Sequence, residues 1–151
     1  MTDGIEIKEL ALEYCPEIVD IHRAIMKGNI SSTWRKSIEL HLQKEGVIGY
    51  VALKDGRVIG FIVGETKGPS FGLEKSGWII GLEAHPHFMG GGIGRLLVET
   101  ILRYFRERNV RDIYTAIRWD AVDMLSFFIS TGFSRSEFVN LGKQLDNIIP
   151  D

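Results

Sequence analysis

Apolar and polar residues recur with two different periods along this chain, and these periods predict where its helices and strands lie. Residues 5–10 alternate apolar and charged side chains, which is typical of a half-buried strand. Spacings of three and four between apolar residues predict helices over about 16–27 and about 33–44. The same spacing from Ile93 to Phe105, with charged residues between, predicts a third helix with one face toward a core.

Short β-rich runs occupy the middle of the chain. The runs 47–54 and 57–67 are separated by Asp55-Gly56, a strong hairpin signal, so we expect these two strands to pair antiparallel. Residues 68–77 hold three glycines, a proline and two serines, which indicates a surface loop. The apolar run 78–84 predicts the next strand.

The last third of the chain continues to alternate strands and helices. The pattern predicts a strand over 111–118, a helix over 120–131 and a final β region from Gly132-Phe133 to near Leu145. The resulting order, β-α-α-β-β-β-α-β-α-β, describes an α/β fold built on one twisted sheet of mixed direction. With 151 residues and no repeat or linker, we expect residues 1–151 to form a single domain.

Composition excludes several classes of function. Lys and Arg number 18 against 20 Asp and Glu, a net charge of -2 with scattered basic residues, which argues against nucleic acid as the main ligand. No apolar run approaches the roughly 18 residues that span a bilayer, and the first residues lack the features of a signal peptide. The lone Cys15 has no disulfide partner, which fits a reducing compartment. We therefore expect a cytoplasmic protein that binds neither nucleic acid nor membrane.

The stretch HPHFMGGGIGRLL, residues 85–97, places four glycines within five positions between a strand-like run and a helix-like run. Free N–H groups at a helix start carry partial positive charge, and a backbone without side chains can close around a phosphate. A tight turn needs only one or two glycines, and each further one costs up to about 1 kcal/mol of chain entropy. The excess therefore favours anion binding over a purely structural turn.

Two nucleotide-binding motifs fail at this loop. A Walker loop requires Gly-Lys-Ser/Thr at the helix start, but Gly94 is followed by Arg95-Leu96. The dinucleotide fingerprint G-x-G-x-x-G fails because no third glycine follows Gly92 and Gly94 at the required spacing. The chain also lacks the acidic residue that this motif requires about 20 positions after the glycines, at the end of a second parallel strand. Neither kind of nucleotide site is therefore expected.

Residues 82–97, LEAHPHFMGGGIGRLL, resemble the acyl-CoA signature of the GNAT acetyltransferase superfamily, in which a strand and a proline precede Q/R-x-x-G-x-G/A at a helix start. The run 89–94 matches that pattern in all but its first residue. Residues 124–133, MLSFFISTGF, resemble the late helix and Gly-Phe of the same superfamily. The resemblance covers nearly the whole chain and implies a GNAT-type fold: one mixed, mostly antiparallel twisted sheet flanked by about four helices.

The resemblance implies acetyl-CoA as cosubstrate and assigns its contacts. The CoA pyrophosphate would lie on the N–H groups of the glycine loop, and the pantetheine arm would pair like an extra strand with residues 82–84. In the superfamily this strand usually splays from its neighbour, here after position 84, and a backbone N–H in that slot would stabilise the oxyanion by about 3 kcal/mol. The residues implied to contact the cofactor are Leu82, Glu83, Ala84, Met89, Gly90, Gly91, Gly92, Ile93, Gly94, Arg95 and Phe128.

Two positions depart from the family pattern. Met89 stands where Gln or Arg is usual, which removes one side-chain contact from a site made mainly by the backbone. Phe128 occupies the position at which many members place a tyrosine that protonates the departing thiolate, and phenylalanine has no proton to donate. A thiol with a pKa of about 8.5 is a fair leaving group as thiolate, and water, Ser126 or Tyr114 are alternative donors.

The general base has three candidates: Glu83, His85 and water. Glu83 is an acidic side chain within an otherwise apolar strand, where burial is costly unless the group is paired or used; an outward-facing position explains it equally well. We take Glu83 as the base, because His85 is expected at the rim. The pair His85 and His87 has no carboxylate or cysteine beside it, so no metal site is expected. His22 and His41 are expected to pack or to face solvent.

The sequence thus predicts an acetyl-CoA-dependent N-acetyltransferase that transfers the acetyl group directly to a primary amine of a small molecule or peptide. A non-catalytic acyl-CoA-binding or regulatory module on the same fold is the alternative, favoured by Met89 and Phe128. No motif identifies the acceptor, and Trp34 and Phe71 are candidates either for its pocket or for the core. The sequence leaves the oligomeric state open; a homodimer through the C-terminal strands is common in the superfamily.

Overall fold

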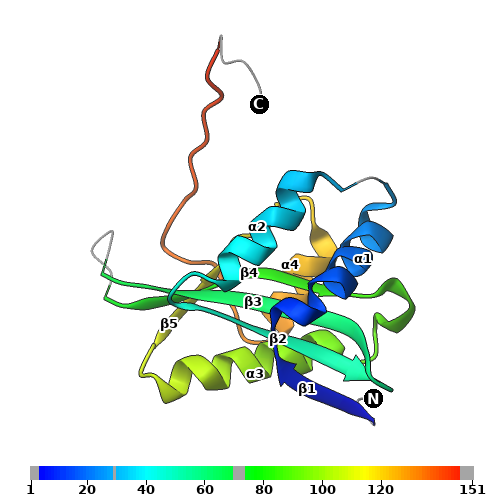
Figure 1. Cartoon of the computed structure of the whole chain (residues 1–151). Coiled ribbons are helices and arrows are strands. Elements are labelled where there is room, and N and C mark those ends of the chain that lie inside the picture. The colour runs from blue at the N-terminus through cyan, green and yellow to red at the C-terminus, as the bar shows by residue number, and fades with distance from the viewer. Residues whose placement is uncertain (1–3, 29, 70–73, 147–151) are drawn as a thin grey trace.

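A computed structural model of the chain describes residues 4–28, 30–69 and 74–146. Its centre is a five-stranded sheet in the order β1-β2-β3-β4-β5 (Figure 1). Neighbouring strands from β1 to β4 pair antiparallel, and β5 runs parallel to β4. The strands are β1 (Ile5–Glu9), β2 (Val47–Lys54), β3 (Arg57–Lys67), β4 (Ser76–Ala84) and β5 (Asp112–Thr115).

Four α-helices of the described chain cover the two faces of this sheet. α1 contacts β3 and β4 and α2 contacts β2 on one face, while α3 contacts β2, β3 and β4 on the other (Figure 1). None of these helices is long and apolar enough to cross a membrane. The helices are α1 (Cys15–Met26), α2 (Ser32–Leu42), α3 (Ile93–Glu107) and α4 (Val122–Ser130), with 3-10 turns η1 (Leu12–Tyr14) and η2 (Pro86–Phe88).

Each face of the sheet has its own apolar core. On the α3 side, the fully buried side chains of Leu97, Ile101 and Phe105 pack against the strands, as the apolar spacing of this helix predicted. On the other side, α1 is fixed to the start of β3 by Glu17, whose Oε2 accepts the N–H of Val58 at 2.8 Å. The sheet is therefore held between two layers of helices, and a residue of β3 or β4 faces one layer or the other.

The predicted hairpin between β2 and β3 is confirmed. Asp55 and Gly56 have φ angles of 50° and 77°, and two positive φ angles at the central residues are the signature of a type I′ turn. The strands on either side end where the sequence predicted. The predicted helices also agree with α1, α2, α3 and α4 to within about two residues at each end.

β4 contains a one-residue bulge at Ile80, which marks the point where it leaves β5. Ile79 and Gly81 face consecutive residues of β3, so Ile80 between them has no partner there. Pairing with β5 ends at Ile79 and Thr115, and β5 is accordingly shorter than predicted. The expectation that β4 splays only after Ala84 is therefore wrong: the two strands part five positions earlier, because the bulge bends β4 at this point.

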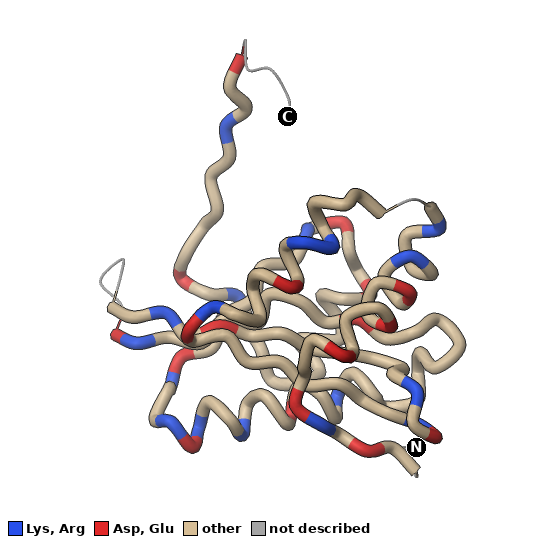
Figure 2. Tube along the Cα trace, in the orientation of Figure 1, with Lys and Arg blue, Asp and Glu red and all other residues tan. Residues whose placement is uncertain are grey.

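Residues 134–146 form an arm that projects away from the body of the molecule (Figure 1). The predicted final β region from Gly132-Phe133 to near Leu145 is wrong, since this segment contains no strand as far as Asp146. Its residues favour strands by composition, but a strand requires a partner to accept its backbone hydrogen bonds, and no strand of the described sheet pairs with this segment. The arm carries only a few charges (Figure 2), and its apolar Leu141 is 93% exposed.

Candidate active site

The glycine loop joins β4 to α3 and has the backbone conformation that its sequence suggested. Gly90 and Gly92 have φ angles of 81° and 85°, in the left-handed region that favours glycine. Gly92 caps α3, and the first intrahelical bond runs from the N–H of Leu96 to the carbonyl of Gly92 at 3.0 Å. The preceding N–H groups of the first turn have no acceptor within the helix, and they lie at the positive end of the helix dipole.

Gly94 and Arg95 hold α3 against α4, whereas Met89 is exposed. A Cβ at Gly94 would lie 3.2 Å from the ring of Phe127, so glycine allows α3 and α4 to approach closely. Arg95 donates from Nη2 to the carbonyl and to the hydroxyl of Ser130, both at 3.3 Å, which links the same two helices. The side chain of Met89 is 58% exposed at the start of the loop. Packing, as well as backbone conformation, therefore explains this concentration of glycine.

Beyond its bulge, β4 has a free edge. The N–H of His85 donates to the carbonyl of Ile59 at 2.8 Å and so points toward β3. Alternate residues of a strand direct their backbone groups to opposite sides, so those of Leu82 and Ala84 point away from β3, into the gap left by β5. No strand within the described ranges pairs with this edge. An extended ligand can therefore be added there as a further strand.

Glu83 faces the α1 side of the sheet, where His22 holds it. Nδ1 of His22 lies 2.6 Å from Oε1 of Glu83, and the two side chains are 17% and 20% exposed. Oε2 is buried and makes no hydrogen bond to the part of the chain described. Burial raises the pKa of Glu83, and the hydrogen bond and charge of His22 partly oppose the rise. The expectation that His22 only packs or faces solvent therefore missed a contact with a site residue.

His22 is in turn fixed by Trp34, the first aromatic residue of α2. The two rings stack face to face with centroids 3.9 Å apart and an angle of 2° between their planes. The hydroxyl of Ser31 accepts the N–H of Trp34 at 3.1 Å and caps the helix, which positions the indole. Three separate elements, α2, α1 and β4, thus place a stacked ring pair beside one carboxylate.

A cavity of about 380 Å³ lies between α2 and this face of the sheet. Gly81 forms part of its wall, and a Cβ at that position would meet only the Phe61 ring, at 4.0 Å. The carboxylate of Glu83 is the only acidic group on the lining. The lining residues are Trp34, Ser37, Ile38, His41, Leu42, Phe61, Val63, Ile80, Gly81 and Glu83.

The predicted proton donors lie apart from this carboxylate. Tyr114 pairs with Trp78, five positions before Glu83 on β4, and its ring packs against Trp78 and Phe138. Ser126 is exposed on α4. Tyr114 therefore belongs to the arm end of the sheet rather than to the cavity that Glu83 lines.

Phe128, predicted to contact the cofactor, is 3% exposed and packs edge to face against Phe127 and Phe133, each at 5.2 Å. It also lines a second cavity, of about 740 Å³, along β5.

The rings of His85 and His87 lie 5.1 Å apart, and Nδ1 of His85 accepts the N–H of His87. Among the described residues, no three His, Cys, Asp or Glu side chains are grouped so that they could hold a metal ion. Phe71, the other candidate for the acceptor pocket, lies outside the described residues.

Comparison with known proteins identifies the family. The model of the acetyltransferase (GNAT) family matches residues 7–133. The chain belongs to this family, as its glycine loop predicted. It is 33% identical over 91 residues, 58% of its length, to a mycothiol acetyltransferase from Amycolatopsis mediterranei strain U-32. That match spans 30% of the length of the Amycolatopsis protein.

Solved structures confirm the predicted fold class. The aminoglycoside N-acetyltransferase AAC(6')-Iy, solved with CoA, aligns with a TM-score of 0.79 at 16% identity over 93% of this chain and 94% of its own. An aminoglycoside acetyltransferase from an uncultured soil metagenomic sample, solved with trehalose, gives a TM-score of 0.78 at 16% identity over 95% of this chain and 98% of its own. At such identities the likeness concerns the fold, which is a mixed sheet between helices.

Proposed function

We propose that this protein uses acetyl-CoA to acetylate a primary amine directly, with Glu83 as the general base. The observation that carries the proposal is that a single strand, β4, leads from the free edge at Leu82 and Ala84 to the glycine loop, with the Glu83 carboxylate on the same segment. Family membership supports acetyl-CoA as the donor. The buried thiol of Cys15 and the absence of a second cysteine fit a cytoplasmic reaction.

The glycine loop fits the diphosphate of CoA. A Cβ at Gly90 would meet nothing within 4 Å, so this side of the loop is open to a ligand. The N–H groups from Met89 to Arg95 would donate to the phosphate oxygens, and the edge groups of Leu82 and Ala84 would pair with the pantetheine amides. The thioester of the bound cosubstrate supplies an activated acetyl group. The Phe128 ring, buried beside α3, would support this end of the site by packing.

Glu83 would remove the proton that the acceptor amine must lose. A C–N bond forms between the acceptor and the acetyl carbon, the C–S bond breaks, and the amine proton passes to the Glu83 carboxylate. An edge N–H at Leu82 or Ala84 would donate to the oxyanion. Because Phe128 has no proton and Tyr114 lies near Trp78, we propose that water protonates the departing thiolate.

Two measurements test this function. Isothermal titration with CoA should give binding, and acetyl-CoA with a panel of primary amines should release free thiol only when an amine is present. Absence of CoA binding overturns the proposal. Binding of CoA without amine-dependent release of thiol from any of the panel would instead favour a non-catalytic acyl-CoA-binding module.

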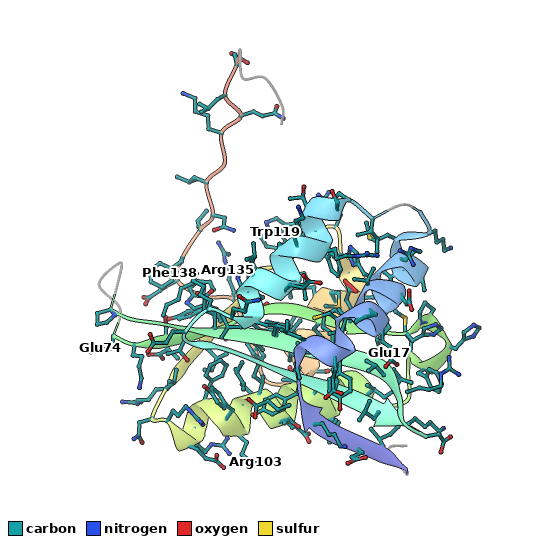
Figure 3. The ribbon with its side chains drawn as sticks, viewed as in Figure 1. Glu17, Glu74, Arg103, Trp119, Arg135 and Phe138 are labelled. Atoms are coloured by element: carbon teal, nitrogen blue, oxygen red, sulfur yellow. The ribbon has the colours of Figure 1, made fainter. Side chains whose placement is uncertain are left out.

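We also propose that residues 1–151 act as one domain and that a second copy completes its sheet. The outer edge of β5 is unpaired within the described chain, and the cavity of about 740 Å³ lies along it. The arm provides exposed apolar side chains that match such a groove, among them Val139, Leu141 and Leu145. Figure 3 shows Arg135 and Phe138 where the arm leaves the body. An arm from a partner chain would pair with β5 and bury these residues in a homodimer.

A further inference from the structure

The cavity beneath α2 has a lining that selects the chemistry of its ligand. We propose that the acceptor is an apolar primary monoamine, a flat ring joined to the amine by a short chain, bound in this cavity with its amine at Glu83. The inference rests on the proposed function, because it gives the amine the partner assigned there. Apart from Glu83, the polar side chains of the lining are Ser37 and His41, and the others are apolar or aromatic.

The charges around the cavity match one ammonium group. Glu83 is the single carboxylate on the lining, and its buried Oε2 has no hydrogen-bond donor among the described residues. One incoming amine would supply that donor. A second or third ammonium on the same ligand would be desolvated against apolar walls without a partner, which is costly. The charged side chains of Arg35, Lys36 and Glu39 on α2 are exposed and are not part of the lining.

The size of the cavity points the same way. Its volume of about 380 Å³ is near the lower end of the range of about 300–1,000 Å³ that small-molecule pockets span. Part of this space exists because position 81 has no side chain, as only the Phe61 ring approaches a Cβ built there, at 4.0 Å. A compact ligand therefore fits, whereas a ligand of several sugar rings would extend beyond the walls.

The aromatic walls favour a flat apolar body. His22 covers one face of the Trp34 indole, so the opposite face and the ring edge are what this side chain can offer a ligand. Phe61 and Val63 contribute further apolar surface from β3. A planar ring can stack offset or edge to face on such walls, which adds about 0.5–1.5 kcal/mol per aromatic pair to the burial of its surface.

The experiment compares four amines with the full-length protein. Thiol release from acetyl-CoA is measured with 2-phenylethylamine, ethylamine, spermidine and sisomicin, and CoA binding is measured separately by calorimetry. We expect kcat/KM for 2-phenylethylamine to exceed that for spermidine and for sisomicin by at least about tenfold. Absence of CoA binding would refute the proposed function itself. If CoA binds but spermidine or sisomicin is preferred, or 2-phenylethylamine is not acetylated, the acceptor inference alone is overturned.

Gly81 provides the steric test. Gly81→Val should raise KM for 2-phenylethylamine at least about tenfold while KM for ethylamine changes by less than about threefold, because only the larger amine needs the space. Gly81→Ala adds one methyl group where nothing clashes and should give a smaller change in the same direction. Gly142→Ala, a methyl group added in open space on the arm, is the matched control and should leave both KM values unchanged. Equal effects of Gly81→Ala on the two amines would contradict the inference.

Discussion

Replacing Glu83 with glutamine would remove a proton acceptor while preserving the shape of the side chain. The glutamine amide can still meet Nδ1 of His22, which lies 2.6 Å from Oε1 in the structure, and its second polar atom replaces the unbonded Oε2. The substitution therefore separates chemistry from folding. A general base contributes typically about 10²–10⁴-fold, or about 2.7–5.5 kcal/mol in the barrier. We expect kcat/KM to fall within that range, with the Kd for CoA unchanged.

The pH profile provides a second readout of the same change. Because burial raises the pKa of Glu83, its carboxyl group loses its proton at a higher pH than an exposed glutamate does. In the native protein kcat/KM should therefore fall on acidification with a midpoint above 4.5, the usual pKa of the group. Glu83→Gln should abolish this acidic limb, because the amide does not titrate.

Stability should change in the opposite sense to activity. A carboxyl group whose pKa is raised by folding stabilises the protein fully below its unfolded pKa, and this contribution is lost as pH rises through the folded pKa. At any pH above the folded pKa, the ionised Glu83 is thus a net cost, so Glu83→Gln should there melt no lower than the native protein. Thiol-release kinetics from pH 5 to 9 and thermal melts at pH 7 test both points. A fall in kcat/KM of less than about tenfold, or an acidic limb whose shape and midpoint are unchanged in the variant, would refute the assignment.

Three further predictions concern His22, the packing at Gly94, and the arm. His22→Ala removes the contact that opposes the rise in the pKa of the base, so the acidic limb of kcat/KM should move to higher pH, and His22→Asn, which keeps a polar group at that point, should restore part of the shift. Gly94→Val would drive a side chain into the aromatic ring beneath it and should lower the free energy of unfolding in urea by about 1–3 kcal/mol. Removal of residues 134–151 should convert a dimer to a monomer in sedimentation, and Leu141→Asp should weaken the dimer; a native protein that sediments as a monomer would exclude the proposed arm exchange.

The features that were predicted correctly are those that depend on residues close together in the sequence. The turn at Asp55 and Gly56 is determined by the two positive φ angles it requires, and the glycine loop by the helix start it precedes. By contrast, His22 and Glu83 are 61 positions apart, and no local pattern links them. The stacking of Trp34 on His22 joins two neighbouring helices and depends on how α2 docks on α1, which no local pattern specifies.

The prediction of strands in residues 134–145 was wrong for a different reason. The apolar residues of this segment have the composition of a strand, and composition was the basis of the prediction, but the arm projects away from the sheet instead of pairing with the open edge of β5 in its own chain (Figure 1). The pattern of apolar and polar residues in one chain indicates which segments can form strands. It does not say from which molecule the neighbouring strand comes.

Because of the bulge at Ile80, the face of the sheet on which Glu83 lies depends on the number of residues in β4. In a regular strand, residues 79 and 83 would share a face, yet Ile79 lies in the core beneath α3 while Glu83 lies beneath α1 and α2. The extra residue reverses the alternation between them. Deleting Ile80 would remove one apolar residue of the cavity lining and no polar group. It would nevertheless turn the Glu83 carboxylate into an apolar core, or rotate the first half of β4 out of that core. For this family member, a change of one in the length of a strand is therefore more damaging than most substitutions within it.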